Sequence, residues 1–184
     1  MKINTKQMNF RDRNLVFIDL EMTGLDPAIH EILEIGCLVV DQKFNVLKTY
    51  NKKVHPEHPE SADPVAIEMT GYTNEKWLNA ISLNDALAEV NVLATDAMFA
   101  GWNVLSDWLF LEKAFLKYKI DPLFDYHLID AMSLAYTKFL HLDKPDGLNL
   151  RKVAEYYQLP MGQIHGAMED ATTTFKVFKK LMEK

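Results

Sequence analysis

The sequence predicts an α/β fold in which a mixed five-stranded sheet carries helices on both faces. Three strand-like segments separated by short turns come first, which indicates an antiparallel start. Short apolar segments then alternate with segments of helical periodicity. An antiparallel start followed by this alternation favours a mixed sheet between two layers of helices.

The first three strands follow from local patterns. Residues 15–20 are apolar and β-branched, and the turn signal of residues 23–27 follows them, so we expect a buried strand that leads into a loop. Residues 32–40 predict a second strand, and residues 41–43 a tight turn. Residues 44–54 then predict a third strand that pairs with the second.

Two helices are expected in the middle of the chain. Asp63 before Pro64 predicts the start of a short helix, and Gly71 predicts its end. Ser82 with Asp85 three residues later resembles a capping box and predicts the start of the second helix. The apolar residues that recur there at helical spacing are Leu83, Leu87, Val90 and Leu93.

Strands and helices alternate in the rest of the chain. The last helix is expected to pack through a stripe formed by Ala171, Phe175, Phe178 and Met182. The remaining segments are expected as loop 55–62, strand 97–102, helix 107–118, strand 126–129, a helix from about residue 131, and helices 148–157 and 167–182.

The length and patterning predict one domain. A chain of 184 residues has the size of a single domain. No stretch rich in Pro, Gly or Ser, no repeat and no low-complexity tract divides it. Residues 1–13 are polar and of mixed charge, so we expect a loose N-terminal arm ahead of a single domain over residues 14–184.

Composition limits the classes of function. The 26 acidic and 20 basic residues give a formal charge of −6, which argues against a broad basic surface for long duplex DNA, but not against nucleic acid held at one small site. Cys37 is the only cysteine, so neither an internal disulfide nor a thiolate zinc site is expected. No signal-peptide core and no apolar run near the roughly 20 residues of a membrane span is present. We therefore expect a cytoplasmic protein without membrane contact.

Asp19 and Glu21 stand at the C-terminal end of the first predicted strand. Their spacing points both side chains to one face, while Ile18 and Leu20 point into the core. Carboxylates this close repel each other and tend to hold a proton unless a divalent cation lies between them. Taken alone, such a pair is more often a strand that ends in two solvated acids.

Two further acids occupy predicted helix starts. Asp107 follows the strand of residues 97–102, and Asp170 lies in the first turn of the last helix, five residues after His165. Taken alone, each acid is more often a cap that accepts free backbone N–H groups, and His165 a surface residue. Asp170, however, lies beside the apolar stripe of its helix, at the rim of the packed face, where a site is expected.

These motifs occur together in the order found in one family. From residue 17 to about residue 181, the sequence resembles the DEDDh 3′→5′ exonucleases of the ribonuclease H-like superfamily. The segment from Phe17 to Pro27 is most similar to oligoribonucleases. The tract from Asn149 to Ala171 is similar to the proofreading exonuclease subunits of bacterial replicative polymerases, and ribonuclease T is a further relative. The resemblance implies the ribonuclease H-like three-layer fold and a hydrolase that removes nucleotides from 3′ ends.

The resemblance also implies the catalytic residues. It makes Asp19, Glu21, Asp107 and Asp170 the ligands of two divalent cations, and His165 the general base. Hard oxygen ligands suit Mg²⁺ or Mn²⁺. The neutral imidazole of His165 could take the proton of the attacking water near neutral pH. The expected products are nucleoside 5′-monophosphates.

Substrate contacts are implied around the same site. The loop after the first strand is expected to receive the 3′-terminal nucleotide, and Gly24 to let the backbone approach closely. Packing behind the site is an equally good interpretation of Trp102. Proofreading relatives usually carry His and an aromatic residue where this chain has Trp102 and Ser106, which affects substrate contacts rather than metal ligands. The implied substrate-binding residues are Met22, Thr23, Gly24, Leu25, Trp102 and Asn103.

Other charged residues are expected to be structural. Asp130 matches an acid that is common in the family, and we expect it to cap a helix rather than to bind metal. Lys138, Lys144, Arg151 and Lys152 could follow a nucleic-acid backbone into the site, but a solvated face is the better interpretation.

The sequence leaves the substrate open. Oligoribonuclease-like degradation of very short RNA competes with proofreading-like or ribonuclease T-like trimming of single-stranded DNA or RNA 3′ ends. The chain ends after its last predicted helix, without the segment that attaches proofreading subunits to a polymerase, so we expect a free-standing enzyme. A homodimer, as in oligoribonucleases and ribonuclease T, is one option. The alternative outside this class is a non-catalytic nucleic-acid-binding subunit.

Overall fold

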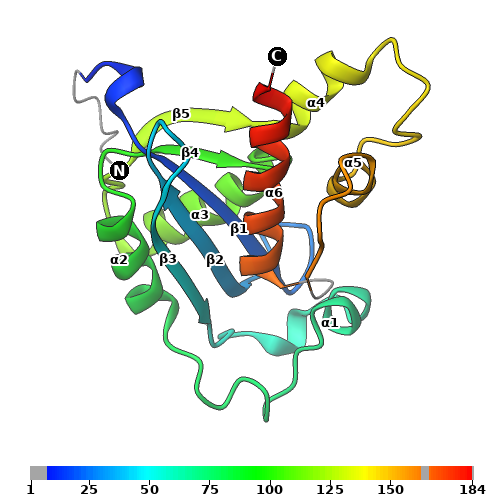
Figure 1. The fold of residues 1–184 in the computed structure, drawn as a ribbon. Coiled ribbons are helices and arrows are strands. Elements are labelled where there is room, and N and C mark those ends of the chain that lie inside the picture. Colours follow the sequence, from blue (N-terminus) through cyan, green and yellow to red (C-terminus); the bar gives the residue numbers. More distant parts are fainter. Residues whose placement is uncertain (1–7, 163–165, 184) are drawn as a thin grey trace.

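The computed structural model describes residues 8–162 and 166–183 (Figure 1). Residues 1–7 of the expected arm lie outside these ranges, as does His165. The elements in chain order are η1 (Phe10–Asp12), β1 (Leu15–Met22), β2 (Ile32–Val40), β3 (Val46–Lys53), η2 (Pro59–Ser61), α1 (Pro64–Thr70), α2 (Leu83–Leu93), β4 (Met98–Gly101), α3 (Leu105–Tyr118), β5 (Asp125–Asp130), α4 (Ala131–Phe139), α5 (Leu150–Tyr156) and α6 (Ala167–Met182).

The five strands form one sheet in the order β3-β2-β1-β4-β5. β2 pairs antiparallel with both β1 and β3, whereas β4 pairs in parallel with both β1 and β5. The predicted mixed sheet is therefore confirmed. Because β1, β4 and β5 run in the same direction, their C-terminal ends meet at one edge of the sheet, where α/β proteins commonly place a site.

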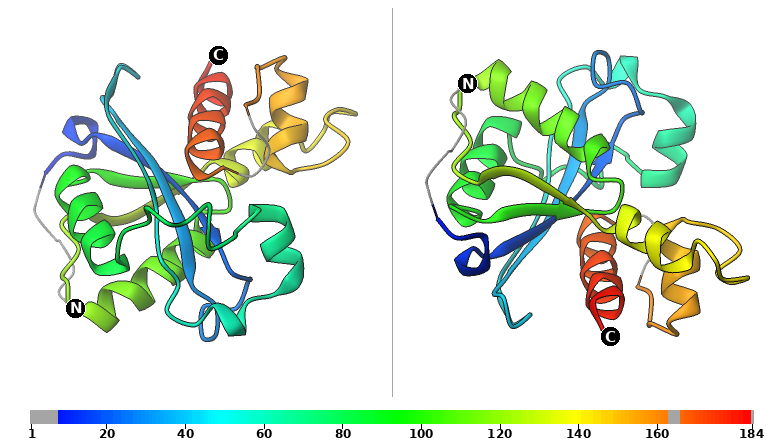
Figure 2. Two further views of the ribbon diagram at one scale, coloured as in Figure 1. Left: turned by 90° about the horizontal axis from the view of Figure 1, so that it is seen from below. Right: turned by 90° about the horizontal axis from the view of Figure 1, so that it is seen from above.

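Alternating side chains of β1 face two different helical layers. Val16, Ile18 and Leu20 pack in the cluster that contains α2 and α3. Leu15 and Phe17 pack in the cluster that contains α6. Figure 2 shows α6 with α4 and α5 on one side of the sheet, and α2 with α3 on the other. The predicted three-layer arrangement is confirmed.

The first two α-helices begin at the predicted capping residues. Asp63 accepts a hydrogen bond from Val65 N–H at 2.8 Å, and Gly71 ends α1 with a φ of 64°. Ser82 accepts a hydrogen bond from Asp85 N–H at 3.1 Å at the start of α2. Across residues 8–162 and 166–183, no helix has both the length and the apolar character that crossing a membrane requires.

Gly36 of β2 lets the first turn of α6 lie directly on the sheet. A Cβ atom at this position would come within 2.2 Å of the backbone of Ala167 and of Met168. Backbone cannot rotate away as a flexible side chain can, so a larger residue would push the helix off the strand. Gly36 also pairs with Asp19 of β1, so this contact brings the start of α6 next to Asp19.

A buried ion pair lies at the opposite edge of the sheet. Arg13, ahead of β1, pairs with Asp125, at the start of β5, at 3.0 Å, and the two side chains are only 3% and 5% exposed. Arg13 also donates a hydrogen bond to the carbonyl oxygen of Asp96 at 2.9 Å. The pair connects the beginnings of two strands that β4 separates.

Three details differ from the prediction. Met182 is exposed, and Leu181 instead ends the apolar stripe of α6, because Leu181 packs in the cluster formed with α4 and α5. Phe44 lies outside β3, because it takes the left-handed backbone conformation in the turn before that strand. α3 begins at Leu105, so Asp107 lies within its first turn rather than at its start.

Candidate active site

Asp19 and Glu21 continue the row of β1 side chains that faces α6. Leu15 and Phe17, earlier in the same row, are buried in the α6 cluster. Because side chains alternate along a strand, Asp19 and Glu21 point to the same side. The row therefore changes from apolar to acidic at the C-terminal end of β1.

Asp170 joins these two acids from α6. It lies in the first turn of that helix. One carboxylate oxygen from each of Asp19, Glu21 and Asp170 lies within 4.8 Å of the other two, and all three side chains are partly buried. The structure thus brings together three of the residues that the sequence selected from two distant segments.

Asp107 approaches the same acids from α3. It is 5% exposed, and its Oδ1 atom accepts a hydrogen bond from Leu20 N–H at 3.1 Å. Leu20 separates Asp19 from Glu21 in β1, so Asp107 is attached to the backbone that carries both acids. A simple helix cap does not account for this contact, which crosses from α3 to β1.

Burial and mutual repulsion raise the pKa values of these carboxyl groups. The pKa of Asp19 lies well above its ordinary value, first because of burial and then because of the neighbouring carboxylates, Asp107 foremost. Burial, followed by the charge of Asp170, raises the pKa of Glu21 to about 7. Burial also raises the pKa of Asp107 to about 7, although the hydrogen bond from Leu20 N–H opposes this rise.

These carboxylates suit a divalent cation. Carboxylate oxygens are hard ligands of the type that Mg²⁺ and Mn²⁺ prefer. A bound cation would also offset the repulsion that raises the pKa values of Asp19 and Glu21. A cation held by these carboxylates would therefore place positive charge at this edge of the sheet, where a phosphate group could bind.

Glu34 is an additional acid at this site that local sequence patterns do not indicate. It pairs with Glu21 across β1 and β2 and is 8% exposed. Burial raises its pKa, whereas a hydrogen bond with the Asn51 side chain and the charge of Lys53 lower it. The register of the β1–β2 hairpin is the sequence signal that could have identified Glu34, because it places Glu34 opposite Glu21.

His165, the expected general base, lies outside the described residues. It directly precedes Gly166, the N-cap residue of α6. Its role therefore stays a prediction from the sequence.

The loop after β1 has a buried base and an exposed tip. Thr23 is fully buried, and its Oγ1 atom accepts a hydrogen bond from Glu31 N–H at 2.8 Å. A Cβ atom on Gly24 would come within 2.4 Å of the His30 ring, so glycine is required for the packing of this ring. Leu25 is 84% exposed and offers an apolar side chain in the loop after β1.

Trp102 and Asn103 follow β4, and Asp130 ends β5, the neighbouring strand. Trp102 is partly buried and packs against two apolar clusters, each of which contains residues of α4, and this supports a packing role. Asn103 is exposed and has a φ of 55°. Asp130 accepts hydrogen bonds from Met132 N–H at 3.3 Å and Ser133 N–H at 3.1 Å, which confirms the predicted helix cap.

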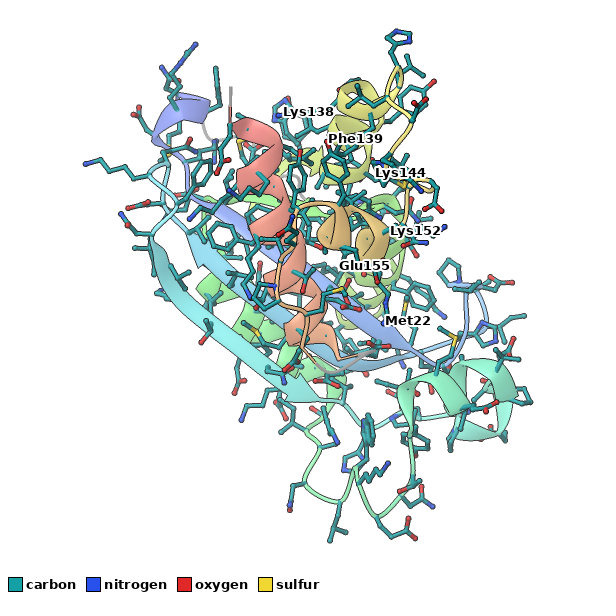
Figure 3. All side chains as sticks on the ribbon, turned by 45° about the vertical axis from the view of Figure 1, so that its right-hand side comes forward. Met22, Lys138, Phe139, Lys144, Lys152 and Glu155 are labelled. Atoms are coloured by element: carbon teal, nitrogen blue, oxygen red, sulfur yellow. The ribbon has the colours of Figure 1, made fainter. Side chains whose placement is uncertain are left out.

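The basic residues near α5 pair with acids of the same region. Lys144 and Lys152 lie 3.9 and 3.2 Å from Asp146, and Arg151 lies 3.2 Å from Glu155. Such exposed pairs contribute little to stability. Figure 3 labels Lys138, Phe139, Lys144, Lys152 and Glu155 around α4 and α5, and Met22 in β1. The pairing favours a solvated face over a track for a nucleic-acid backbone.

Comparison with known proteins identifies nuclease relatives. The RNase_T family model, described as an exonuclease, matches residues 16–178. The PolC-type DNA polymerase III of Thermotoga maritima is 30% identical over 174 residues, which cover 95% of this chain and 12% of that protein. DNA polymerase III subunit epsilon of Aquifex aeolicus is 27% identical over 195 residues, covering 100% of this chain and 90% of that subunit. The oligoribonuclease of Vibrio vulnificus is 58% identical over 40 residues, 22% of each chain.

A solved structure shares the fold. E. coli exonuclease I in complex with a dT13 oligonucleotide matches with a TM-score of 0.82 at 18% identity, and the match covers 92% of this chain and 41% of that chain. The likeness confirms the predicted ribonuclease H-like architecture. The present chain spans 12% of the PolC-type polymerase and 90% of the epsilon subunit, so its relatives differ greatly in what they add to this domain.

Proposed function

Because this chain belongs to the RNase_T family of exonucleases, we propose that it hydrolyses phosphodiester bonds at the 3′ ends of single-stranded or short nucleic acids. The products are nucleoside 5′-monophosphates. The observation that carries this proposal is the group of carboxylate oxygens from Asp19, Glu21 and Asp170, which lie within 4.8 Å of one another. Asp107, attached to Leu20 N–H, supplies a fourth carboxylate from the other side of β1.

The proposal includes two divalent cations, Mg²⁺ or Mn²⁺, held by Asp19, Glu21, Asp107 and Asp170. The oxygen donors and the raised pKa values of Asp19, Glu21 and Asp107 support this assignment. When bound, such cations neutralise charge that develops on the phosphate and the leaving 3′ oxygen, and lower the pKa of a water molecule.

His165 is the proposed general base. An imidazole with an ordinary pKa of about 6.5 is largely neutral at physiological pH and can accept the proton of the attacking water. Its place in the sequence, just before α6, supports this role because Asp170 lies in the first turn of that helix. Removal of this proton leaves a nucleophile that attacks the terminal phosphate, and the 3′ oxygen of the shortened strand departs.

The loop after β1 is the proposed binding site for the terminal nucleotide. The exposed Leu25 offers apolar contact to a base, and so does Met22, the last residue of β1, which is partly buried against the α2 and α3 cluster. Thr23 and Gly24 hold the loop through the hydrogen bond to Glu31 and the packing on His30. The exposed Asn103 adds a polar group from the end of β4.

The first experiment follows 3′ ends of labelled single-stranded DNA and RNA with Mn²⁺ present. We expect stepwise shortening from the 3′ end that EDTA stops, and no turnover by Asp19→Ala. Turnover by that variant at the wild-type rate would disprove the assignment. Tight binding without shortening by the wild-type chain would instead support the non-catalytic alternative.

Substrate length separates the two candidate roles within the class. Sequence identity to the oligoribonuclease is 58%, but that alignment covers only 22% of the chain. The alignment with the epsilon subunit has 27% identity and covers 100% of the chain. We therefore favour trimming of longer single-stranded 3′ ends. Comparing rates on dinucleotides and longer oligonucleotides of RNA and DNA tests this choice, and activity on dinucleotides alone would overturn it. The molecular mass of the protein in solution tests whether it forms a homodimer.

A further inference from the structure

Asp130 contacts two helix starts at once. It ends β5 and pairs with Gly101, the last residue of β4. Its carboxylate caps α4 through Met132 and Ser133. Met132 N–H donates to Oδ1 and Ser133 N–H to Oδ2, and Oδ1 also accepts hydrogen bonds from Asn103 N–H at 2.9 Å and from Val104 N–H at 3.4 Å. A cap of α4 does not require these two contacts, which reach into the loop between β4 and α3.

The loop between β4 and α3 depends on an external acceptor. Asn103 has a φ of 55°, a conformation that non-glycine residues adopt at some cost. Val104, the N-cap residue of α3, is 4% exposed and has no side chain able to accept a hydrogen bond. Ser106 N–H donates a hydrogen bond to Asn103 O at 3.0 Å, which closes a turn in this loop. Asp130 therefore supplies the acceptor that the residues at the start of α3 lack.

This loop determines where Asp107 lies. Asp107 is in the first turn of α3, three residues after Val104, which Asp130 holds. Its carboxylate in turn accepts the hydrogen bond from Leu20 N–H in β1. A continuous series of hydrogen bonds and short backbone segments thus runs from β5 through the start of α3 to the strand that carries Asp19 and Glu21.

We propose that Asp130 is a positioning residue for the exonuclease site, acting on Asp107 and Asn103 through the β4–α3 loop. This inference rests on the proposed function for its catalytic consequence. It assigns Asp130 no contact with substrate or metal. The hydrogen bonds to Asn103 and Val104 stand independently of the reaction and can be tested by themselves.

Two substitutions separate this role from helix capping. Asp130→Ser keeps a good N-cap for α4, because a serine hydroxyl accepts N–H groups of the first helical turn. Its single, shorter oxygen cannot also reach Asn103 and Val104. Asp130→Asn keeps an acceptor of the original length that can still bind both N–H groups. Ser82→Ala, which removes the cap of α2, is the control for general loss of helix stability.

Three measurements test the proposal. Amide hydrogen exchange of Asn103 and Val104 should be faster in Asp130→Ser than in wild type and in Asp130→Asn. Mn²⁺ affinity, measured by calorimetry, should fall in Asp130→Ser. Its kcat should fall roughly 10- to 100-fold, because small displacements of catalytic groups reduce rates on this scale, and its KM should rise, because the substrate contact proposed for Asn103 is displaced as well. Ser82→Ala should lower the melting temperature and leave kcat unchanged.

The outcomes are distinguishable. Unchanged exchange of both amides, or kcat and Mn²⁺ affinity of Asp130→Ser equal to wild type, would overturn the positioning role. A kcat loss in Ser82→Ala as large as in Asp130→Ser would also overturn it, since general destabilisation would then explain the result. A wild-type chain that never shortens 3′ ends refutes the proposed function. Amide exchange and Mn²⁺ affinity then decide the role of Asp130.

Discussion

The Oδ1 atom of Asp107 lies 3.1 Å from the backbone nitrogen of Leu20 and accepts its hydrogen bond. This contact joins a helix on one side of the sheet to the strand that carries Asp19 and Glu21. Every residue type except proline keeps a backbone N–H at position 20, so the contact depends mainly on the acceptor at position 107. The two functions of Asp107, accepting this hydrogen bond and carrying charge, can therefore be separated.

Asp107→Asn should fold normally and lose activity. The asparagine side chain keeps an oxygen for Leu20 N–H but removes a charge that raises the pKa of Asp19. We expect kcat to fall by roughly 10²-fold or more, as for loss of a metal-site ligand, with a melting temperature at least equal to wild type. Asp107→Ala is the comparison, and it should lose both activity and stability. Equal activity of wild type and Asp107→Asn would exclude a catalytic role for this carboxylate.

Without divalent cations, stability should fall as the pH rises toward 7. The pKa of Glu21 rises from 4.5 to about 7 in the folded state, and that of Asp107 rises from 3.8 to about 7. Between these values the folded state binds more protons than the unfolded state, so the free energy of unfolding decreases with increasing pH. This contribution is fully present below the unfolded values and is lost above about pH 7. Thermal unfolding in EDTA across this window provides the measurement.

The same experiment with Mn²⁺ is the control. A cation that binds the ionised carboxylates stabilises the folded state increasingly as they lose their protons. The melting temperature should therefore rise on adding Mn²⁺ most strongly near and above pH 7. Glu21→Gln should flatten the pH dependence in EDTA. An unchanged profile in this variant would show that Glu21 is not one of the groups responsible.

Gly36→Ala should weaken both the fold and the reaction. The new methyl group would meet the backbone of Ala167 and Met168 at 2.2 Å, so α6 must move away from β2. We expect a loss of about 1–3 kcal/mol or more in the free energy of unfolding, together with reduced activity, because Asp170 moves with α6. Gly147→Ala is a matched control, since its methyl group would meet only the flexible Lys152 side chain. Equal stability of both variants would contradict this account.

Arg13→Met should destabilise the protein strongly. It leaves the buried carboxylate of Asp125 without its guanidinium partner. Breaking a buried ion pair in this way costs about 3–5 kcal/mol, which denaturant unfolding can measure. Adding Asp125→Asn to Arg13→Met should recover part of the loss, because the buried negative charge, which then faces only His127 among the described residues, is removed. A double variant less stable than Arg13→Met alone would argue against charge as the cause.

His165→Ala should reduce turnover without reducing cation binding. A positioned general base contributes roughly 10²- to 10⁴-fold to the rate. We expect kcat to fall within this range while Mn²⁺ affinity stays at the wild-type value. His141→Ala removes an exposed histidine beyond α4 and should have no effect. A similar loss in both histidine variants would contradict a specific role for His165.

The shared face of Asp19 and Glu21 could be predicted because a local rule applies to it. The alternation in β1 determines that Asp19 and Glu21 share the face of Leu15 and Phe17. Their meeting with Asp170 depends on a long-range contact, the approach of α6 to β2 at Gly36, and only the family resemblance indicated it in the sequence.

Other features could not be predicted because they depend on register or on distant segments. Glu34 joins the site through its pairing with Glu21, which requires the exact hairpin register. Asp130 was expected as a cap of α4, and local patterns did not reveal its hydrogen bonds to Asn103 and Val104 in another loop. A helical pattern selected Met182 for the apolar stripe, whereas packing on neighbouring helices decides it.

Because α6 lies directly on Gly36, the spacing of the acids and the surface proposed for nucleotide contact depend on different parts of the molecule. The spacing between the strand acids and the helix acid is set by main chain against main chain, with no side chain between them. The surface proposed to receive a nucleotide instead includes side chains of the loop after β1, such as that of Leu25, which is 84% exposed. Substitutions in that loop can therefore alter which nucleic acids are accepted while the distances among the carboxylates stay the same.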